Sequence, residues 1–332
     1  MQDHGRINAL KQYLLLIRLP NVFTAPSNIL AGYFAAVPLV QANGFHLVSL
    51  MVSSGLLYVA GIALNDYFDM ETDRRERPGR PLPSGRVPRA HALAIAIAAI
   101  AAANATIALT VNSLASLAIS VALTGAIVAY DYSLKRGPAA AFAMGATRFL
   151  NVILGASPAI TTVIVVASSA AAFGQERLLA AAVFAAAMQF AYVVAIMMLS
   201  KKEATVSGSS SSNGSSRNEG PSVYAAFLII AGVVVSIAAV GLFLLQFKPE
   251  FLVNLAIFAG VMAAIFFFFV NDRRLAGSGS PSRVSHAVKN MVLSIVVLDS
   301  VFVAGSAGLE YGLATLLFAV PAFLLAKRLY VT

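Results

Sequence analysis

The chain contains no cysteine and few charged residues. Without cysteine among its 332 residues, it can form neither disulfides nor thiolate metal sites. Charged residues make up only 11% of the chain, whereas hydrophobic residues make up 59%. This composition is too apolar for an ordinary water-soluble domain. We therefore expect an all-α fold, a polytopic transmembrane helix bundle.

Acidic residues are especially scarce. The 14 Asp and Glu residues stand against 23 Lys and Arg residues, which gives a net charge of +9. In a soluble protein this charge would suggest nucleic acid binding, but a membrane protein collects basic residues in its cytoplasmic loops. We therefore expect no nucleic acid partner. Residues 1–11 are polar and lack the apolar stretch of a cleavable signal peptide, so the first span is expected to direct insertion.

Long apolar runs predict ten membrane spans. They lie near residues 12–39, 46–68, 90–109, 112–131, 140–163, 177–200, 222–245, 250–270, 287–305 and 309–327. If the N-terminus is cytoplasmic, 20 of the 23 Lys and Arg residues fall in cytoplasmic segments, and Arg177 and Lys248 fall outside. This asymmetry predicts that both termini are cytoplasmic. A nine-span arrangement would place Lys327 and Arg328 outside, which the charge pattern disfavours.

The chain is expected to form one membrane domain over residues 1–332, without a convincing internal repeat. Two stretches rich in Ser and Gly, near 207–220 and 276–284, are expected to be flexible cytoplasmic linkers. The loops predicted on the opposite side are short. Chemistry is therefore expected on the cytoplasmic side.

Four polar residues follow the second apolar run and are candidates for chemistry: Asn65, Asp66, Asp69 and Asp73. At about 100° per residue, their side chains fall within about 100° of arc on one helix face. Carboxylates so close together repel one another and are costly to desolvate at a membrane surface. Their shared face indicates a divalent cation between them.

An arginine-rich loop comes next, and four prolines within residues 78–88 exclude a continuous helix there. Carboxylates beside arginines suit an anionic phosphate compound with Mg²⁺. Carboxylate oxygens hold the metal, the metal bridges phosphate oxygens, and guanidinium groups take the remaining charge. The alternative is a capped helix end followed by basic residues that only set the topology. The one-face arrangement of the four Asn and Asp side chains favours a functional site.

Polar side chains inside the predicted spans form a second group of candidates. Arg148 and Asn151 lie one turn apart, and an arginine inside a membrane faces a polar cavity or a partner. A cavity role is preferred over pairing with a carboxylate such as Asp299. Two narrow polar stripes suit cavity-lining faces, with interhelical hydrogen bonding as the alternative. They comprise Asn21, Thr24 and Asn28 in the first span, and Gln189, Tyr192, Ser200 and Glu203 in the sixth.

One known family matches the aspartate pattern. The chain resembles the UbiA membrane prenyltransferases, whose first signature it carries as Asn65-Asp66-x-x-Asp69-x-x-x-Asp73, then Arg77-Pro78 and Arg80-Pro81-Leu82-Pro83-Ser84-Gly85. The resemblance implies a UbiA-like nine-helix core around a central cavity over residues 12–305, with 309–327 as a tenth, C-terminal span. It also implies that Mg²⁺ and an isoprenyl diphosphate bind at the aspartate-rich helix end. The prenyl chain would ionise to an allylic cation, which an acceptor captures.

The resemblance further implies roles for individual residues. Asn65, Asp66, Asp69 and Asp73 would bind metal and diphosphate, and Arg77 and Arg80 would contact the diphosphate. Tyr130–Arg136 resembles a Tyr/Lys segment of the family, in which Lys135 would contact diphosphate; a simple inside-facing charge pair is the alternative. Catalysis would depend on Asp66, Asp69, Asp73 and Arg148. The remaining substrate-binding residues would be Asn151, Asn21, Asn28, Tyr192, Lys201, Lys202 and Glu203.

The family's second aspartate-rich motif is missing. At its expected place the sequence reads Leu199-Ser200-Lys201-Lys202-Glu203-Ala204-Thr205-Val206, in which Glu203 is the one carboxylate. One of two metal positions would then be poorly held, and Lys201 or Lys202 could replace its charge as a point donor to phosphate. This pattern resembles the EboC-like branch of the superfamily.

Three functions compete. The favoured one is Mg²⁺-dependent transfer of an isoprenyl group from a polyprenyl diphosphate to a hydrophobic acceptor (aromatic, quinone precursor or lipid-like). The enzyme would be a prenyltransferase surrounded by the lipids of a bacterial inner (plasma) membrane. The second is a non-catalytic UbiA-like protein for prenyl-lipid binding or precursor trafficking. A secondary transporter is disfavoured because the sequence has neither an inverted repeat nor a matching pair of broken helices.

Overall fold

A computed structural model describes residues 10–136, 139–166, 172–208, 220–271 and 281–329. Only the backbone is described at 161–166, 172–175, 201–208, 220–224, 281–284 and 326–329, and at Arg136. Within these ranges, every regular element is a helix. The prediction of an all-α bundle is confirmed.

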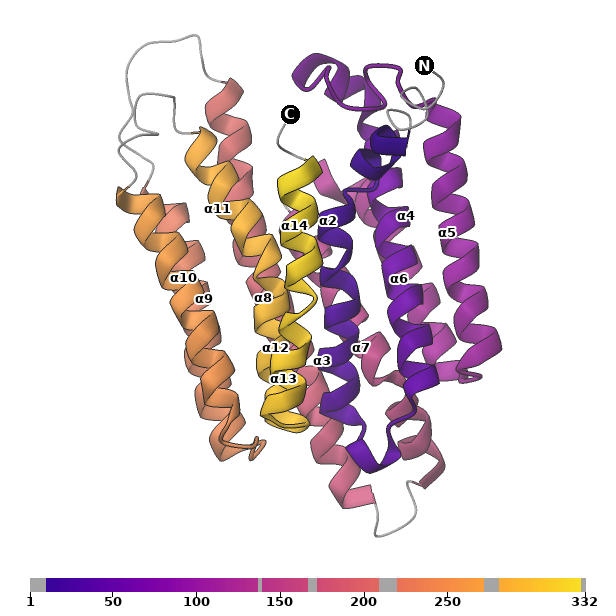
Figure 1. Cartoon of the computed structure of the whole chain (residues 1–332), viewed down its shortest axis with the longest axis vertical. Helices are drawn as coiled ribbons and strands as arrows, with labels where there is room; N and C mark the ends of the chain where they lie inside the picture. The colour runs from indigo at the N-terminus through magenta and orange to yellow at the C-terminus, as the bar shows by residue number, and fades with distance from the viewer. Residues whose placement is uncertain (1–9, 137–138, 167–171, 209–219, 272–280, 330–332) are drawn as a thin grey trace.

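Long helices lie side by side and give the molecule its shape (Figure 1). In chain order they are α2 (Leu19–Val22), α3 (Thr24–Ala36), α4 (Gly44–Glu76), α5 (Arg89–Thr110), α6 (Leu114–Tyr132), α7 (Ala140–Val166), α8 (Ala172–Gly208), α9 (Gly220–Phe243), α10 (Phe251–Asn271), α11 (Pro281–Leu293), α12 (Ile295–Ser306), α13 (Leu309–Leu316) and α14 (Ala319–Leu329). Two short 3₁₀ turns, η1 (Leu39–Gln41) and η2 (Leu134–Arg136), stand between them. Each helix from α4 to α10 matches one predicted apolar run, whereas α11 shares a run with α12 and α13 shares one with α14.

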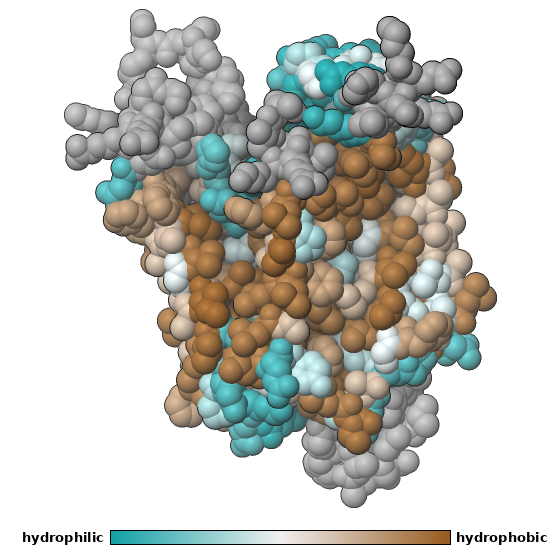
Figure 2. Space-filling model, viewed as in Figure 1, coloured by the Kyte–Doolittle hydropathy of each residue, from teal (hydrophilic) through white to brown (hydrophobic). Residues whose placement is uncertain are grey.

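The length and composition of the helices fit a membrane. Among the described residues, eight helices are long and apolar enough to cross one, and a bent pair at the start of the chain makes a ninth span. Figure 2 shows the hydrophobic surface as a broad band, with hydrophilic residues gathered toward the two ends. The chain is therefore an integral, multi-pass membrane protein.

The first span is bent, which the prediction of one continuous helix over 12–39 missed. The helix Leu10–Leu16 meets Leu19–Ala36 at 46°. Arg18, at the bend, has a left-handed backbone with φ 47° and ψ 50°. Pro20 explains the break, because its ring clashes with the carbonyl of the residue four positions earlier, Leu16, and it lacks an N–H.

The predicted tenth span coincides with α13 and α14, which are separated by two turn residues. The described part of this stretch, Leu309–Leu325, is apolar and helical. Pro321 accounts for the interruption in the same way as Pro20 does. Both predicted linkers are shorter than expected in the described residues, since α8 extends to Gly208, α9 starts at Gly220 and α11 starts at Pro281. The rest of both linkers lies outside the described residues.

Two glycines bring α3 and α7 into backbone contact. A Cβ added at Gly32 would lie 1.8 Å from the carbonyl oxygen of Val152, and one added at Gly155 would lie 2.4 Å from that of Ile29. Helices in membranes associate through small residues of this kind, which let the backbones approach closely. As a result, polar side chains on α3 face those on α7 at short range.

Candidate functional site

The four residues of the predicted signature lie at the end of one uninterrupted helix, α4. Asp66 and Asp73 are each 4% exposed, whereas Asn65 and Asp69 are half-buried. The helix continues to Glu76, and the backbone N–H of Arg77 donates to the carbonyl of Asp73. Pro78 then prevents further helix. The prediction that these four side chains share one face requires a continuous helix, and α4 provides it.

Each of these aspartates contacts a cation. The Arg18 guanidinium donates to Asp66 at 2.8 Å, and Arg80 lies 2.6 Å from Asp73 and 3.7 Å from Asp66. The Lys135 ammonium lies 2.9 Å from Asp69. We call Asn65, Asp66, Asp69 and Asp73, with Arg18, Arg80 and Lys135, the aspartate cluster.

Two members of this neighbourhood were not predicted as site residues. Arg18 was counted only among the cytoplasmic basic residues, although it stands two positions before a proline that bends the chain. Asp131 is 2% exposed at the end of α6, where the charges of Lys135 and Asp69 act on it. The sequence carried a signal for Asp131, because it lies in the segment that contains Lys135.

The loop after α4 holds Arg80 over the helix end. Leu82 and Val87 are each 1% exposed and pack in one cluster with Leu16 of the N-terminal helix. Burial of these apolar side chains anchors the loop that carries Arg80. Arg77 differs from Arg80, since it is exposed and its side chain forms no hydrogen bond or ion pair with the described residues. The structure thus brings one of the two predicted loop arginines to the aspartates.

The donor types fit Mg²⁺. The cation prefers hard oxygen ligands, and proteins usually supply one or two carboxylates while phosphates and waters complete its octahedron. Asn65, Asp66, Asp69 and Asp73 offer such oxygens on one helix. Among the described residues, however, no three acidic or histidine side chains converge on one point. The set therefore suits a metal that arrives with phosphate oxygens better than a metal bound by the protein alone.

A second polar group lies between α3, α7, α8 and α12. Asp299 is fully buried on α12 and accepts hydrogen bonds from Ser27 at 2.6 Å, Asn28 at 2.9 Å and Gln189 at 2.6 Å. Arg148 lies on the other side of Asn28, whose amide oxygen accepts from its Nη1 at 3.1 Å. We call Ser27, Asn28, Arg148, Asn151, Gln189 and Asp299 the core polar network.

Arg148 is only 9% exposed, and its contacts are neutral. It donates to the carbonyl of Thr24 at 3.4 Å and to the Thr24 hydroxyl at 3.2 Å, and its guanidinium lies 5.1 Å from the centre of the Tyr58 ring. Asn151 donates to the carbonyl of Ala25 at 3.0 Å. The sequence favoured a cavity role for Arg148 over pairing with Asp299, and the cavity role stays a prediction. In the structure the two are linked through Asn28, without a direct ion pair.

The remaining predicted residues are dispersed. Asn21 is half-buried beside the bend, and its carbonyl accepts from Thr24. Tyr192 is fully buried, with its hydroxyl 2.7 Å from that of Ser294, so it joins α8 to the start of α12, and its predicted substrate-binding role stays a prediction. The side chains of Lys201, Lys202 and Glu203 lie outside the described residues, so their predicted role stays a prediction.

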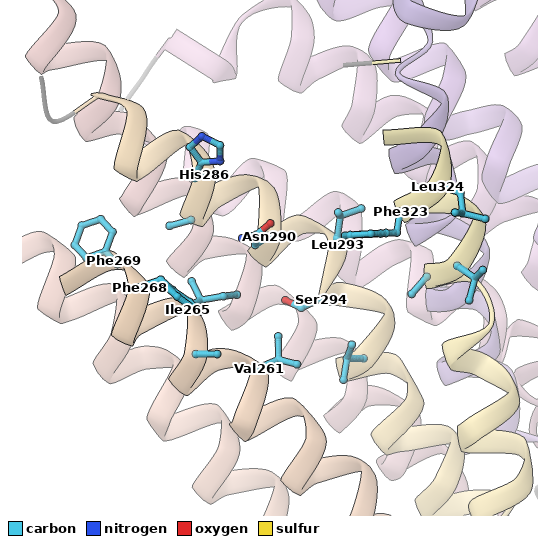
Figure 3. Close-up of a pocket in the computed structure, with 15 residues that line it drawn as sticks. Val261, Ile265, Phe268, Phe269, His286, Asn290, Leu293, Ser294, Phe323 and Leu324 are labelled. Carbon is cyan, nitrogen blue, oxygen red and sulfur yellow. The ribbon is translucent and has the colours of Figure 1, made fainter. Parts of the chain in front are cut away.

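A cavity of about 910 Å³ opens between α10, α11, α12 and α14 (Figure 3). Its walls are mainly apolar, with Phe268 and Phe269 on α10 and Phe323 on α14. His286 and Asn290 give it a polar margin on α11 (Figure 3). No lining residue comes from α4 or α6, so this cavity is separate from the aspartate cluster.

Comparison with known proteins gives the family. A profile of the UbiA prenyltransferase family matches residues 25–278. Digeranylgeranylglyceryl phosphate synthase of Saccharolobus solfataricus is 35% identical over 92 residues, which cover 27% of this chain and 32% of that protein. The match thus spans about a third of that relative's length.

Two solved structures share the fold. A UbiA homolog from Aeropyrum pernix K1 aligns with a TM-score of 0.61 at 17% identity, over 85% of this chain and 96% of its own. A UbiA homolog from Archaeoglobus fulgidus, bound to GPP and Mg²⁺, aligns with a TM-score of 0.55 at 16% identity, over 92% and 99%. The helical arrangement, the signature on α4 and the family profile agree, and the chain belongs to the UbiA prenyltransferase family.

Proposed function

We propose that the protein transfers an isoprenyl group from its diphosphate to a hydrophobic acceptor within the membrane, with Mg²⁺ as cofactor. The aspartate cluster carries this proposal. It joins three carboxylates and three cations at the end of α4, which is a set of groups that suits a metal diphosphate. The relative named digeranylgeranylglyceryl phosphate synthase and the homolog bound to GPP and Mg²⁺ support it.

In this proposal, Asn65, Asp66, Asp69 and Asp73 hold the metal, which neutralises diphosphate charge and so eases departure of the leaving group. Arg18, Arg80 and Lys135 now contact carboxylates. A diphosphate brings oxygens that compete for the same N–H donors, so these three side chains can turn from carboxylate to phosphate.

The reaction then breaks the bond between the allylic carbon and the diphosphate oxygen, and the electron pair leaves with the diphosphate. The acceptor forms a bond to the allylic carbon and loses a proton. Donors that face the departing diphosphate oxygens stabilise the charge that develops there. We assign this role to Lys135 and Arg148.

The acceptor is proposed to be lipid-like, aromatic or a quinone precursor. The apolar cavity between α10 and α14 suits a ligand with a large hydrophobic part, but it is separate from the aspartate cluster and is not assigned to the acceptor. We also propose that the aspartate cluster faces the cytoplasm, since the arginine-rich loop after α4 and Lys135 lie at that end of the bundle. This orientation places both termini on the cytoplasmic side, and we propose a bacterial inner membrane as the location.

The alternative is a protein that binds a prenyl diphosphate without turnover. The missing second aspartate motif favours it, because Lys201 and Lys202 stand where the family carries metal ligands. The relation to the EboC-like branch stays a prediction.

Pyrophosphate release tests the proposal. The purified full chain in lipid nanodiscs, with geranylgeranyl diphosphate, Mg²⁺ and candidate acceptors, is expected to release pyrophosphate and form a prenylated product. The Asp66→Asn/Asp69→Asn double variant is expected to lower the rate by roughly 10²–10³-fold, as for the loss of other groups that stabilise transition-state charge.

Glu71→Gln is the matched control. Glu71 lies on the same helix, but it is exposed and pairs only with Arg74 among the described residues. The rate of pyrophosphate release by the Glu71→Gln variant is expected to stay within about two-fold of the wild-type rate. Equal release by the wild type and the double variant would contradict the enzyme, and Mg²⁺-dependent binding without product would favour the alternative.

A further inference from the structure

We propose that Asp299 is a positioning residue: it fixes the amide of Asn28, and that amide orients the Arg148 guanidinium toward an anionic substrate. The inference rests on the proposed function, because that function supplies the anion. Asp299 itself is fully buried and touches no cavity described above.

The contacts of Asp299 are unusual for a buried carboxylate. Ser27 and Gln189 each donate to it at 2.6 Å, and the Asn28 amide donates to both of its oxygens at 2.9 Å. All three donors are neutral. A buried charge is costly unless it is paired, and the cation that can compensate this one is Arg148, one side chain farther on.

A carboxylate only accepts hydrogen bonds, so it decides how neighbouring amides are turned. Asn28 must point its NH₂ group at Asp299, and its oxygen then faces Arg148 at 3.1 Å and Asn151 at 3.4 Å. Gln189 shows the same constraint, because turning its NH₂ group to Asp299 leaves its Oε1 buried without a partner among the described residues. Asp299 thus accounts for the orientation of Gln189, and Asp299 and the donor-only Arg148 guanidinium together fix that of Asn28.

The contacts of Arg148 do not use all of its N–H donors. Its hydrogen bonds use the two terminal nitrogens and go to Asn28 and Thr24. A guanidinium has five N–H donors, so the Nε–H is not engaged by these contacts. A direct ion pair with Asp299 would cancel the positive charge of Arg148. The intervening neutral amide holds the guanidinium in place and preserves its charge for a phosphate group.

A double-mutant cycle separates positioning from simple stabilisation of the bundle. In Asp299→Asn, the new NH₂ group is a donor and faces the donors that Asp299 accepted from. The Asn28 amide therefore loses its fixed orientation. The variant is expected to weaken Mg²⁺-dependent binding of geranylgeranyl diphosphate about ten-fold, with a similar fall in kcat/KM. In an Arg148→Gln background, the same change is expected to have no further effect, because coupled residues are not additive.

Asn254→Leu is the control for a lost buried amide. Asn254 is also fully buried and donates to Ser300 on α12, but it has no contact with Arg148 or Asn28. The Asn254→Leu variant is expected to change thermal stability, while its affinity for geranylgeranyl diphosphate stays within about two-fold of the wild-type value. Additive effects of the Asp299 and Arg148 changes would overturn the inference.

The binding readout also keeps the two proposals apart. If the wild type binds the diphosphate without releasing pyrophosphate, the proposed transferase activity is wrong, and the double-mutant cycle, measured as changes in Kd, still tests the positioning role. If the wild type releases pyrophosphate but the effects of the two changes are additive, only the positioning role is wrong.

Discussion

In the aspartate cluster, Asp66, Asp69 and Asp73 each contact a lysine or arginine, whereas in the core polar network Asp299 contacts three neutral donors. Both regions bury carboxylates, and both contain arginine. They differ in how the opposite charges are arranged. In the cluster the carboxylates contact the cations directly, whereas in the network the Asn28 amide lies between Asp299 and Arg148.

This difference in arrangement indicates that the aspartate cluster and the core polar network have different roles. Ion pairs at a partly exposed helix end can exchange partners, because water and an incoming phosphate compete for the same donors. Arg80 and Arg18 retain some exposure, 26% and 32% of their side chains. Hydrogen bonds among fully buried groups have no such competitor, since breaking one leaves a polar atom without a partner. The cluster is thus built to rearrange around a ligand, and the network is built to stay fixed.

The largest expected effect comes from separating α3 and α7, which carry four of the six residues of the core polar network. Gly32→Ala would place a methyl group 1.8 Å from the Val152 carbonyl oxygen, so the helices must move apart. We expect destabilisation of about 3 kcal/mol or more and loss of Arg148 function, measured by thermal unfolding and diphosphate binding. Gly125→Ala on α6, where a Cβ meets nothing within 4 Å, should be neutral or slightly stabilising. Equal behaviour of the two variants would contradict the backbone contact.

A smaller effect is expected in the cluster. Arg80→Ala removes the cation shared by Asp73 and Asp66, and the diphosphate loses a donor. We expect diphosphate binding to weaken by roughly 10–100-fold while Mg²⁺ alone binds more tightly, because two carboxylates lose a competing cation. Isothermal titration measures both. Arg75→Ala, an exposed position on α4, is the control. Weakened binding of Mg²⁺ alone would show that Arg80 does not compete with the metal.

The smallest effect is expected at the rim of the network. Ser54 donates to the Asn151 side-chain oxygen at 2.7 Å, and Ser54→Ala leaves that buried oxygen without this donor. The free energy of unfolding should fall by about 1 kcal/mol, with binding within about two-fold of wild type. Thermal unfolding and titration together check this. A ten-fold loss of binding would mean that Asn151 contacts the ligand directly.

Much of the fold was readable from apolar runs, because a spanning helix must be long and apolar. Each of the ten predicted spans has a helical counterpart in the described residues, but the first is bent and two turn residues interrupt the tenth. Both irregularities lie beside prolines, Pro20 and Pro321. A hydropathy profile averages over many residues and so does not detect a single proline, whereas one proline is enough to interrupt a helix.

The candidate site was predictable where it is local. Asn65, Asp66, Asp69 and Asp73 share a helix face, so spacing alone groups them. Arg80 and Lys135 were predicted beside them through the family resemblance, and the structure brings both into contact. Arg18 was missed because its contact with Asp66 spans 48 positions along the chain, and spacing carries no signal over that distance.

The sequence by itself determined that the protein crosses a membrane many times and that one helix ends in a face of aspartates. Hydrophobicity and helical periodicity are local properties, and they are written directly in the residue order. Only the tertiary structure decided that Arg80 and not Arg77 reaches those aspartates, and that Arg148 meets Asp299 through an amide. Such contacts depend on how closely the helices approach, which glycines such as Gly32 and Gly155 set through packing in three dimensions.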